Sequence, residues 1–330
     1  MRKRLKFAGT VSLTALIVAV IVWQVEDFGE VWRLMARLAP VYVLLAILLN
    51  MLDRGLMAYK WGLLLGGRGI PVPFLFKMKV YCAAMVWGMF LPATVGADTI
   101  RILSTSRAGV DVKEVTASVI VERLLGFLAS VVCGLASLAL LTYSQALDAR
   151  YQSLWGVSLG LLSLTVLALM ASFSDRVYGL VHDRLLGRIA HTGPARKLRY
   201  FHDTYRGYRT NRTALWAFFG LTMAEQVVPI FIFWVLALGM GIPVSFLQIA
   251  AAVPLAFLVS RLPISAEGVF DGAFMAILAG AGVPPAQSLS ITLAGRALQI
   301  VAWLPWWAAH VLQTGSLKPP AQAQQSFEVK

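Results

Sequence analysis

The chain has 330 residues, of which 58% are hydrophobic and 14% are charged, and its mean hydropathy is +0.73. Ordinary soluble domains carry about 25% charged residues, so this composition excludes them and indicates a polytopic membrane protein. The net charge of +13 does not indicate nucleic-acid binding, because the basic residues gather at the ends of apolar runs and in one loop. Cys82 and Cys133 lie inside apolar segments, which excludes a disulfide framework.

Long apolar runs predict six full transmembrane helices, because one span needs roughly 20 apolar residues. The first run, 7–23, follows a basic start and lacks a small-residue cleavage site, so we expect a retained helix rather than a signal peptide. The other five runs lie at 40–65, 113–142, 151–172, 214–238 and 287–313. Two further apolar stretches, 74–107 and 246–280, are interrupted near their centres by proline and glycine.

The lysines and arginines predict the orientation, because cytoplasmic loops of membrane proteins are enriched in them. The basic N-terminus and the arginine-rich loop 174–213 are both expected in the cytoplasm. The stretch 74–107 must then enter the membrane and turn back on the cytoplasmic side, and the stretch 246–280 must do so from the outside. We therefore predict two re-entrant helical hairpins in a cell inner (plasma) membrane, with both termini cytoplasmic.

The loop 174–213 contains the run DRVYGLVHDRLLGRI, in which apolar residues recur at helical spacing beside arginines. This pattern is typical of an amphipathic helix lying on anionic lipid. The alternative is a solvated connector that only enforces the topology. The segment 317–330 is predicted to be a disordered tail.

The two interrupted stretches match each other at a nearly constant distance in the sequence. Pairs of like residues 171 to 173 positions apart are Pro92 and Pro263, Asp98 and Asp271, Gly109 and Gly282, and Arg123 and Arg296. We interpret the halves 40–142 and 214–313 as an inverted repeat within one membrane domain, residues 1–316. Inverted repeats with broken helices are the architecture of many alternating-access carriers.

Ionisable residues at membrane depth form the candidate substrate-binding site. A charge at the bilayer centre costs about 2.5 to 3.5 kcal/mol on insertion scales, so such residues face each other or a polar cavity. The candidates are Arg54, Asp98, Arg101, Glu122, Arg123, Arg261, Glu267, Asp271 and Arg296. The alternative for any one of them is a structural ion pair between helices.

The tips of the two hairpins are the second part of the candidate site. The tip residues are Pro92, Gly96, Pro263 and Gly268. Backbone that is not helical inside the hydrocarbon is tolerated only where protein or water satisfies it, so the tips indicate an internal cavity. The positive ends of the returning helices would favour an anionic group such as a phosphate there. The alternative for the two glycines is close helix packing.

The sequence carries no signature of a soluble enzyme. It has no P-loop, GxGxxG, HExxH, CxxC pair or DxD motif, and its four histidines lie in the basic loop and near the end of the last apolar run. We therefore predict no catalytic residue, no metal site and no cofactor, and we do not expect an enzyme.

The run LPATVGADTIRILSTSRAGVDVKEVTASVIVERLLGF and the later LPISAEGVFDGAFMAILAGAGV, followed by GRALQ, resemble a known family. It is the flippase-like membrane family typified by the transmembrane region of lysylphosphatidylglycerol synthase, and the resemblance covers about residues 7–313. The first run matches the family pattern at Gly96, Asp98, Arg101, Gly109, Glu122 and Arg123. The second departs from it, because its tip is two residues shorter, Gly268 stands alone, and Asp271 replaces the usual glutamate.

The resemblance implies that a lipid moves between leaflets. Members that make aminoacylated lipid carry a large soluble catalytic domain after the membrane part, so we do not expect synthase activity from a chain ending at Lys330. The leading hypothesis is a protein that translocates or presents an anionic phospholipid or a polyprenyl-phosphate-linked lipid. The alternatives are a polytopic lipid-modifying transferase and a non-catalytic membrane partner of a separate synthase or glycosyltransferase.

Overall fold

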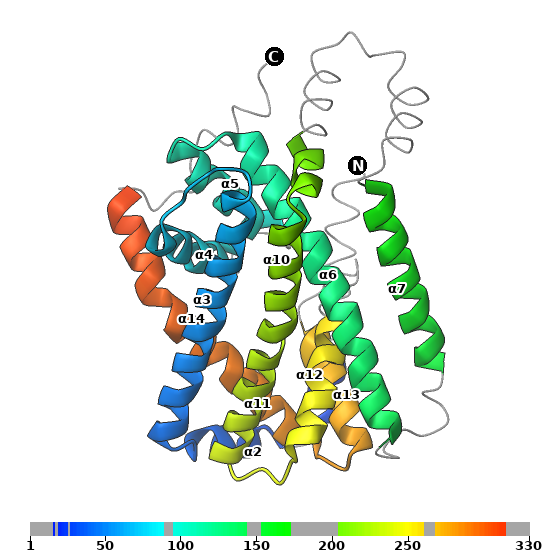
Figure 1. The fold of residues 1–330 in the computed structure, drawn as a ribbon. Coiled ribbons are helices and arrows are strands. Elements are labelled where there is room, and N and C mark those ends of the chain that lie inside the picture. Colours follow the sequence, from blue (N-terminus) through cyan, green and yellow to red (C-terminus); the bar gives the residue numbers. More distant parts are fainter. Residues whose placement is uncertain are drawn as a thin grey trace, which may run out of the picture. The chain divides into compact units, whose positions relative to one another are not determined.

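The computed structural model describes residues 16, 19–25, 27–88, 95–143, 153–172, 204–260 and 268–314. Every regular element in these ranges is helical (Figure 1), which confirms the predicted all-α class. Several predictions lie outside the described residues: most of the first helix at 7–23, most of the loop 174–213, the tail 317–330, and the residues Pro92, Arg261, Pro263 and Glu267.

Three helical stretches in the described part are long and apolar enough to cross a membrane. They are α3 (Pro40–Gly66), α6 (Val112–Tyr143) and the stretch Arg212–Gly239, which α10 (Arg212–Glu225) and α11 (Val227–Gly239) share. Two further predicted spans are occupied by the helices α7 (Ser153–Ser172) and α14 (Pro285–Thr314). The chain is thus an integral membrane protein, and the total of six spans stays a prediction.

The chain folds into two compact units, each assembled from three separate stretches of sequence. Unit 1 comprises Met1–Asp53, Ala129–Leu162 and Met223–Ala302. Unit 2 comprises Arg54–Leu128, Ser163–Thr222 and Trp303–Lys330. The helices α3, α6 and α14 therefore each contribute one part to each unit.

Unit 2 is built around a pair of short helices, α4 (Phe74–Gly88) and α5 (Val95–Arg107), which pack against each other. Small residues on both helices, Ala84 and Ala97, are buried where they meet. A second cluster of buried side chains joins α3, α6 and α10: Leu64, Ala117, Val121, Tyr205, Tyr208 and Phe218. Burial of this apolar and aromatic surface holds the helices of the unit together.

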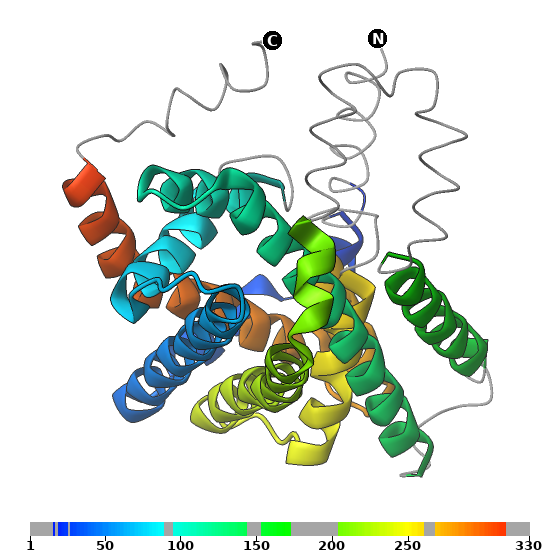
Figure 2. The same cartoon turned by 45° about the horizontal axis from the view of Figure 1, so that its top comes forward.

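Unit 1 is built around the corresponding pair, α12 (Phe246–Ser260) and α13 (Val269–Gly280), which lie side by side in both ribbon views (Figure 2). The helix α11 also packs on α12. In one buried cluster, Ile21 and Val25 lie together with Val31 of the helix α2 (Phe28–Ala36). A second buried cluster consists of Leu138, Leu141, Ala251 and Leu255.

A proline inside α12 frees a carbonyl that a neighbouring helix satisfies. Pro254 has no N–H group, so the carbonyl of Ala250 loses its usual partner within the helix. The hydroxyl of Ser137 on α6 donates to this carbonyl at 3.2 Å. Because unpaired backbone groups are costly inside a membrane, this hydrogen bond allows α12 to keep its proline.

A second proline explains the break between α10 and α11. Pro229 cannot donate to the carbonyl of Glu225, and α10 ends at that residue. The side chain of Gln226, which lies at the break, donates to the hydroxyl of Ser130 on α6 at 2.9 Å. The interruption of this span thus has a local cause and a specific polar contact.

The helix pairs of the two units have matching local structure. The helices α4 and α12 both have 15 residues and begin 172 positions apart, each with a phenylalanine. The turn after α5 contains Gly109 at a φ of 94°, and the turn after α13 contains Gly282 at a φ of 79°. Both values lie in the left-handed region, which glycine adopts without steric cost at the end of a helix.

The backbone hydrogen bonds of these two turns are also the same. The N–H groups of residues 108, 109 and 110 donate to the carbonyls of residues 105, 106 and 105. The N–H groups of residues 281, 282 and 283 donate to the carbonyls of residues 278, 279 and 278, each exactly 173 positions further on. Each unit therefore holds one copy of the same arrangement, a pair of short helices followed by a glycine turn and a long helix.

Candidate functional site

Unit 2 holds an ion pair between Asp98 and Arg123. Asp98 lies in the first turn of α5, where the positive end of the helix favours a carboxylate. The Nε and Nη2 groups of Arg123 on α6 donate to its two carboxylate oxygens, both at 2.9 Å. The side chain of Arg123 is 49% exposed, while that of Asp98 is 20% exposed. The acid thus holds one edge of a guanidinium group that faces outward.

Unit 1 holds a matching ion pair between Asp271 and Arg296. Asp271 lies in the first turn of α13, a helix that begins directly after Gly268, which has a φ of 85°. The Nη2 and Nε groups of Arg296 on α14 donate to its carboxylate oxygens at 2.5 and 3.3 Å. The side chain of Arg296 is 42% exposed and that of Asp271 is 7% exposed. In both units the acid precedes its arginine by 25 residues.

Each arrangement suits reversible binding of an anion. A guanidinium group has five N–H groups in a planar fork that matches a carboxylate or a phosphate, and a bidentate acid uses two of them. A phosphate approaching the exposed face of Arg123 therefore meets a cation whose orientation Asp98 has already set. The same acid would compete with a bound phosphate for the arginine.

Behind the outer pair of unit 2 lies a buried ionic network. Arg101 is 2% exposed, and its Nη1 and Nη2 groups donate to the carboxylate of Glu122 at 3.1 and 2.5 Å. The hydroxyl of Tyr81 donates to the same carboxylate at 2.6 Å. An Nη1 group of Arg101 also lies 3.7 Å from Asp98. The four charged residues thus form one chain, from Glu122 through Arg101 and Asp98 to Arg123.

Two aromatic rings enclose the guanidinium group of Arg101. Its central carbon lies 4.0 Å from the centroid of the Tyr81 ring and 4.5 Å from that of Trp61. Trp61 is itself held in place by its indole N–H, which donates to the hydroxyl of Ser118 at 2.9 Å. Arg101 is therefore surrounded by protein, and among the arginines of this network only Arg123 is substantially exposed.

Unit 1 has no counterpart of this inner ionic network at the matching positions. The residues 173 positions after Arg101 and Glu122 are Phe274 and Gly295. The ring of Phe274 is fully buried and lies 5.4 Å from the ring of Phe233, centroid to centroid. A Cβ on Gly295 would lie 3.2 Å from the same Phe233 ring, so any larger residue there would require this ring to shift. The inner layer is therefore ionic in unit 2 and aromatic in unit 1.

The remaining candidates have separate positions. Arg54 stacks on the ring of Trp303, with 5.3 Å between its central carbon and the ring centroid. Gly96 is the second residue of α5, and Gly268 directly precedes α13 in the left-handed conformation. In the described residues, no group of three or more histidine, cysteine or acidic side chains is arranged to hold a metal ion.

Sequence reasoning missed the residues that complete the buried network. Tyr81, Trp61 and Ser118 are ordinary residues of apolar helices, and no motif distinguishes them. Lys60 was also missed; it is buried, and its ammonium group lies 5.3 Å from the centroid of the Phe218 ring. For Lys60 and Trp61 a signal was available, because both follow Asp53 and Arg54 within the apolar helix α3.

The sequence matches a known family over most of its length. The family model described as the lysylphosphatidylglycerol synthase TM region matches residues 11–306. This range includes both helix pairs and all the candidate residues named above. No curated protein matches the chain.

Proposed function

This chain belongs to the family of the lysylphosphatidylglycerol synthase transmembrane region, and from that premise we propose that it translocates an anionic lipid between the leaflets of a membrane. The family is named for a lipid, and the chain is an integral membrane protein. We propose that the phosphate of the lipid headgroup binds to Arg123 and to Arg296 in turn while the acyl chains stay in the bilayer. In this proposal the lipid is moved without being chemically changed.

The observation that carries the proposal is the pair of equivalent Asp–Arg contacts. Each acid lies in the first turn of a short helix, each arginine follows it by 25 residues, and each arginine side chain is between 42% and 49% exposed. The exposed edge of each guanidinium group leaves N–H groups that an incoming phosphate can use. In carriers built from inverted repeats, the substrate site lies where the two repeats meet, so equivalent positions of both repeats can contribute to it.

The matching helix pairs support a repeat, and we propose that the repeat is inverted. In this arrangement 74–107 enters the membrane from the cytoplasm and 246–280 from the outside, with the tips around Pro92 and Pro263 meeting a polar cavity. The basic residues of the loop 174–213 favour the same orientation, with both termini in the cytoplasm of an inner membrane. The halves would then expose the headgroup site first to one side and then to the other.

The direct test is translocation of fluorescent phosphatidylglycerol in vesicles reconstituted with the purified protein. We expect Arg123→Gln and Arg296→Gln each to slow the movement of labelled lipid to the opposite leaflet by about tenfold, because each removes a charge-assisted contact of about 1.5 kcal/mol or more with the phosphate. The matched control is Arg33→Gln, which removes the exposed Arg33–Asp27 pair on α2, 2.6 Å apart, and should leave the rate unchanged.

Two results would overturn the site assignment or the function. If Arg123→Gln and Arg296→Gln fold normally and move lipid at the rate of the unchanged protein, the two arginines do not bind the headgroup. If the protein instead converts a labelled lipid donor to a new product in detergent micelles, where no leaflets exist, it is a transferase rather than a translocator.

A further inference from the structure

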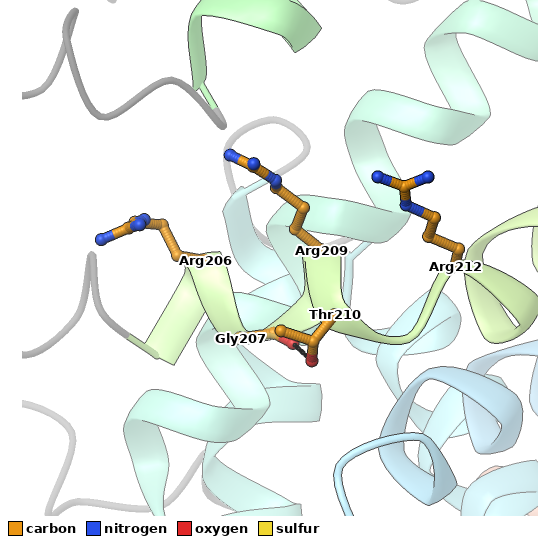
Figure 3. Close-up of a pocket in the computed structure, with 5 residues that line it drawn as sticks. All are labelled: Arg206, Gly207, Arg209, Thr210 and Arg212. Atoms are coloured by element: carbon orange, nitrogen blue, oxygen red, sulfur yellow. Dashed lines mark hydrogen bonds between the residues drawn. The ribbon is translucent and has the colours of Figure 1, made fainter.

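A hollow of about 530 Å³ in unit 2 is lined by Arg206, Gly207, Arg209, Thr210 and Arg212 (Figure 3). Three of these five residues carry a positive charge, and none is acidic. Figure 3 shows the side chains of Arg209 and Arg212 extending to the same side of the backbone, away from Thr210. Positive charge gathered along a concave surface favours the approach of anions.

The backbone below the hollow is firmly anchored. Tyr208 is buried in the cluster with Leu64 and Phe218, and its hydroxyl donates to the carbonyl of Glu114 at 3.3 Å. The side-chain amide of Asn211 donates to the carbonyl of Gly67 at 3.2 Å, and its oxygen accepts the N–H of Ala214 at 3.0 Å. The backbone is therefore anchored on both sides of Arg209, and Arg206 and Arg212 lie within two residues of an anchor.

The charge of the underlying Arg68 is compensated separately. Its Nη2 and Nε groups donate to the carboxylate of Glu114 at 2.8 and 3.2 Å, and this hydrogen-bonded acid raises the pKa of Arg68 above its ordinary value. Arg68 packs directly against Gly207, where any Cβ would overlap its guanidinium group. The carboxylate of Glu114 thus serves Arg68, and the residues that line the hollow are three arginines, a glycine and a threonine.

The position of the hollow indicates the source of the anion. Arg212 is the first residue of the membrane-span candidate Arg212–Gly239. The end of a span lies at the level of the lipid headgroups, where anionic lipids present their phosphates at high local concentration. A volume of about 530 Å³ is in the range of small-molecule sites and exceeds what a single phosphate needs.

We propose that this hollow binds the phosphate of an anionic phospholipid headgroup from the leaflet at the Arg212 end of α10. Arg206, Arg209 and Arg212 are the ligands, and the guanidinium forks donate to the phosphate oxygens in a bidentate manner. The site is separate from the Asp–Arg pairs described above and does not depend on the proposed translocation. Binding there would hold the Arg212 end of the span at the level of the anionic headgroups.

The test is retention of phosphatidylglycerol by the full chain, measured by native mass spectrometry after extraction from vesicles of equal parts phosphatidylcholine and phosphatidylglycerol. We expect the triple variant Arg206→Gln/Arg209→Gln/Arg212→Gln, made in an Arg123→Gln/Arg296→Gln background so that the proposed translocation sites retain no lipid, to bind phosphatidylglycerol at least tenfold more weakly than that background does. The triple lysine variant keeps the charge without the planar fork and should lose several-fold. The control Arg107→Gln removes an exposed arginine at the end of α5 and should have no effect.

Inorganic phosphate is the second probe, because it shares the chemistry without the lipid. We expect it to displace phosphatidylglycerol only at concentrations far above those at which the lipid binds. Equal affinity for the two probes would overturn the assignment to a lipid. Undiminished retention of phosphatidylglycerol by a folded triple glutamine variant would overturn the site itself, whatever the result of the translocation assay.

Discussion

At the scale of single residues, the charges of this protein divide into exposed and enclosed ones. Arg123 and Arg296 are held at one edge by an acid and exposed at the other. Arg101 is enclosed by Glu122, Tyr81 and Trp61. The enclosed arginine sets the position of Asp98, which in turn orients the exposed one. In the proposed function, Arg101 and Glu122 are therefore positioning residues, and Arg123 is the residue that we propose contacts the headgroup.

The first prediction concerns this enclosed pair. Glu122→Gln should lower the free energy of unfolding by about 3 kcal/mol or more, because it leaves the buried charge of Arg101 without its carboxylate. Thermal unfolding in detergent, followed by a thiol-reactive dye as Cys82 becomes accessible, measures the loss.

Two comparison variants make this prediction specific. Glu114→Gln removes the partner of Arg68 in a pair whose side chains are 22% to 25% exposed, and it should cost about 1 kcal/mol or less. The double variant Arg101→Met/Glu122→Leu removes both charges and should recover most of the lost stability. Equal destabilisation by Glu122→Gln and Glu114→Gln would contradict the interpretation of the enclosed pair.

At the scale of elements, helix breaks are placed by prolines and glycines and are then stabilised from neighbouring helices. Pro229 separates α10 from α11, while Pro254 lies inside α12 without ending it. The carbonyl of Ala250, which Pro254 frees, accepts a hydrogen bond from the hydroxyl of Ser137 on α6. The glycine turns after α5 and α13 have the same hydrogen bonds, because in both places the backbone must turn after a short helix.

The second prediction concerns this contact between α6 and α12. Ser137→Ala should reduce stability by about 0.5 to 1.5 kcal/mol, because the carbonyl of Ala250 then lacks a donor. In the Pro254→Ala background the N–H of residue 254 can donate to that carbonyl, so the same serine substitution should cost much less. A double-mutant cycle from thermal unfolding measures the coupling, and strictly additive effects of the two substitutions would contradict it.

At the scale of the whole molecule, the chain forms two interleaved units, and each holds one copy of the same helix arrangement. Unit 2 contains α4, α5 and the ionic inner layer, and unit 1 contains α12, α13 and the aromatic inner layer. The copies therefore share the outer Asp–Arg pair and differ behind it. This pattern supports a common task for the outer pairs and a task for the inner network in only one copy.

The third prediction concerns the membrane topology of the two copies. Ala108→Cys and Ala281→Cys, made separately in a background without Cys82 and Cys133, place a thiol at the same position of the two glycine turns. A membrane-impermeant maleimide should label residue 281 in intact cells and residue 108 only after permeabilisation, because the repeat is predicted to be inverted. Labelling of both residues from the same side would rule out the inverted arrangement.

Local chemistry made much of this protein predictable from its sequence. Hydropathy over about 20 residues predicts the helices α3 and α6, since a span must hide its backbone from lipid whatever lies beside it. The glycine turns and the separation of 173 residues between the two aspartates were also visible, because turn conformations and repeats are properties of the chain itself. The family resemblance, which rests on the same motifs, is confirmed.

Which acid meets which arginine depended on tertiary structure. Glu122 and Arg123 are neighbours in the sequence, but successive residues of a helix point about 100° apart, so they serve different partners. Glu122 faces Arg101 and Tyr81 in the interior, while Arg123 reaches Asp98 at the exposed edge. The arginine hollow before α10 likewise exists only because Tyr208 and Asn211 anchor that segment on residues far away in the sequence. Contacts between distant segments depend on packing, and packing is decided by the fold as a whole.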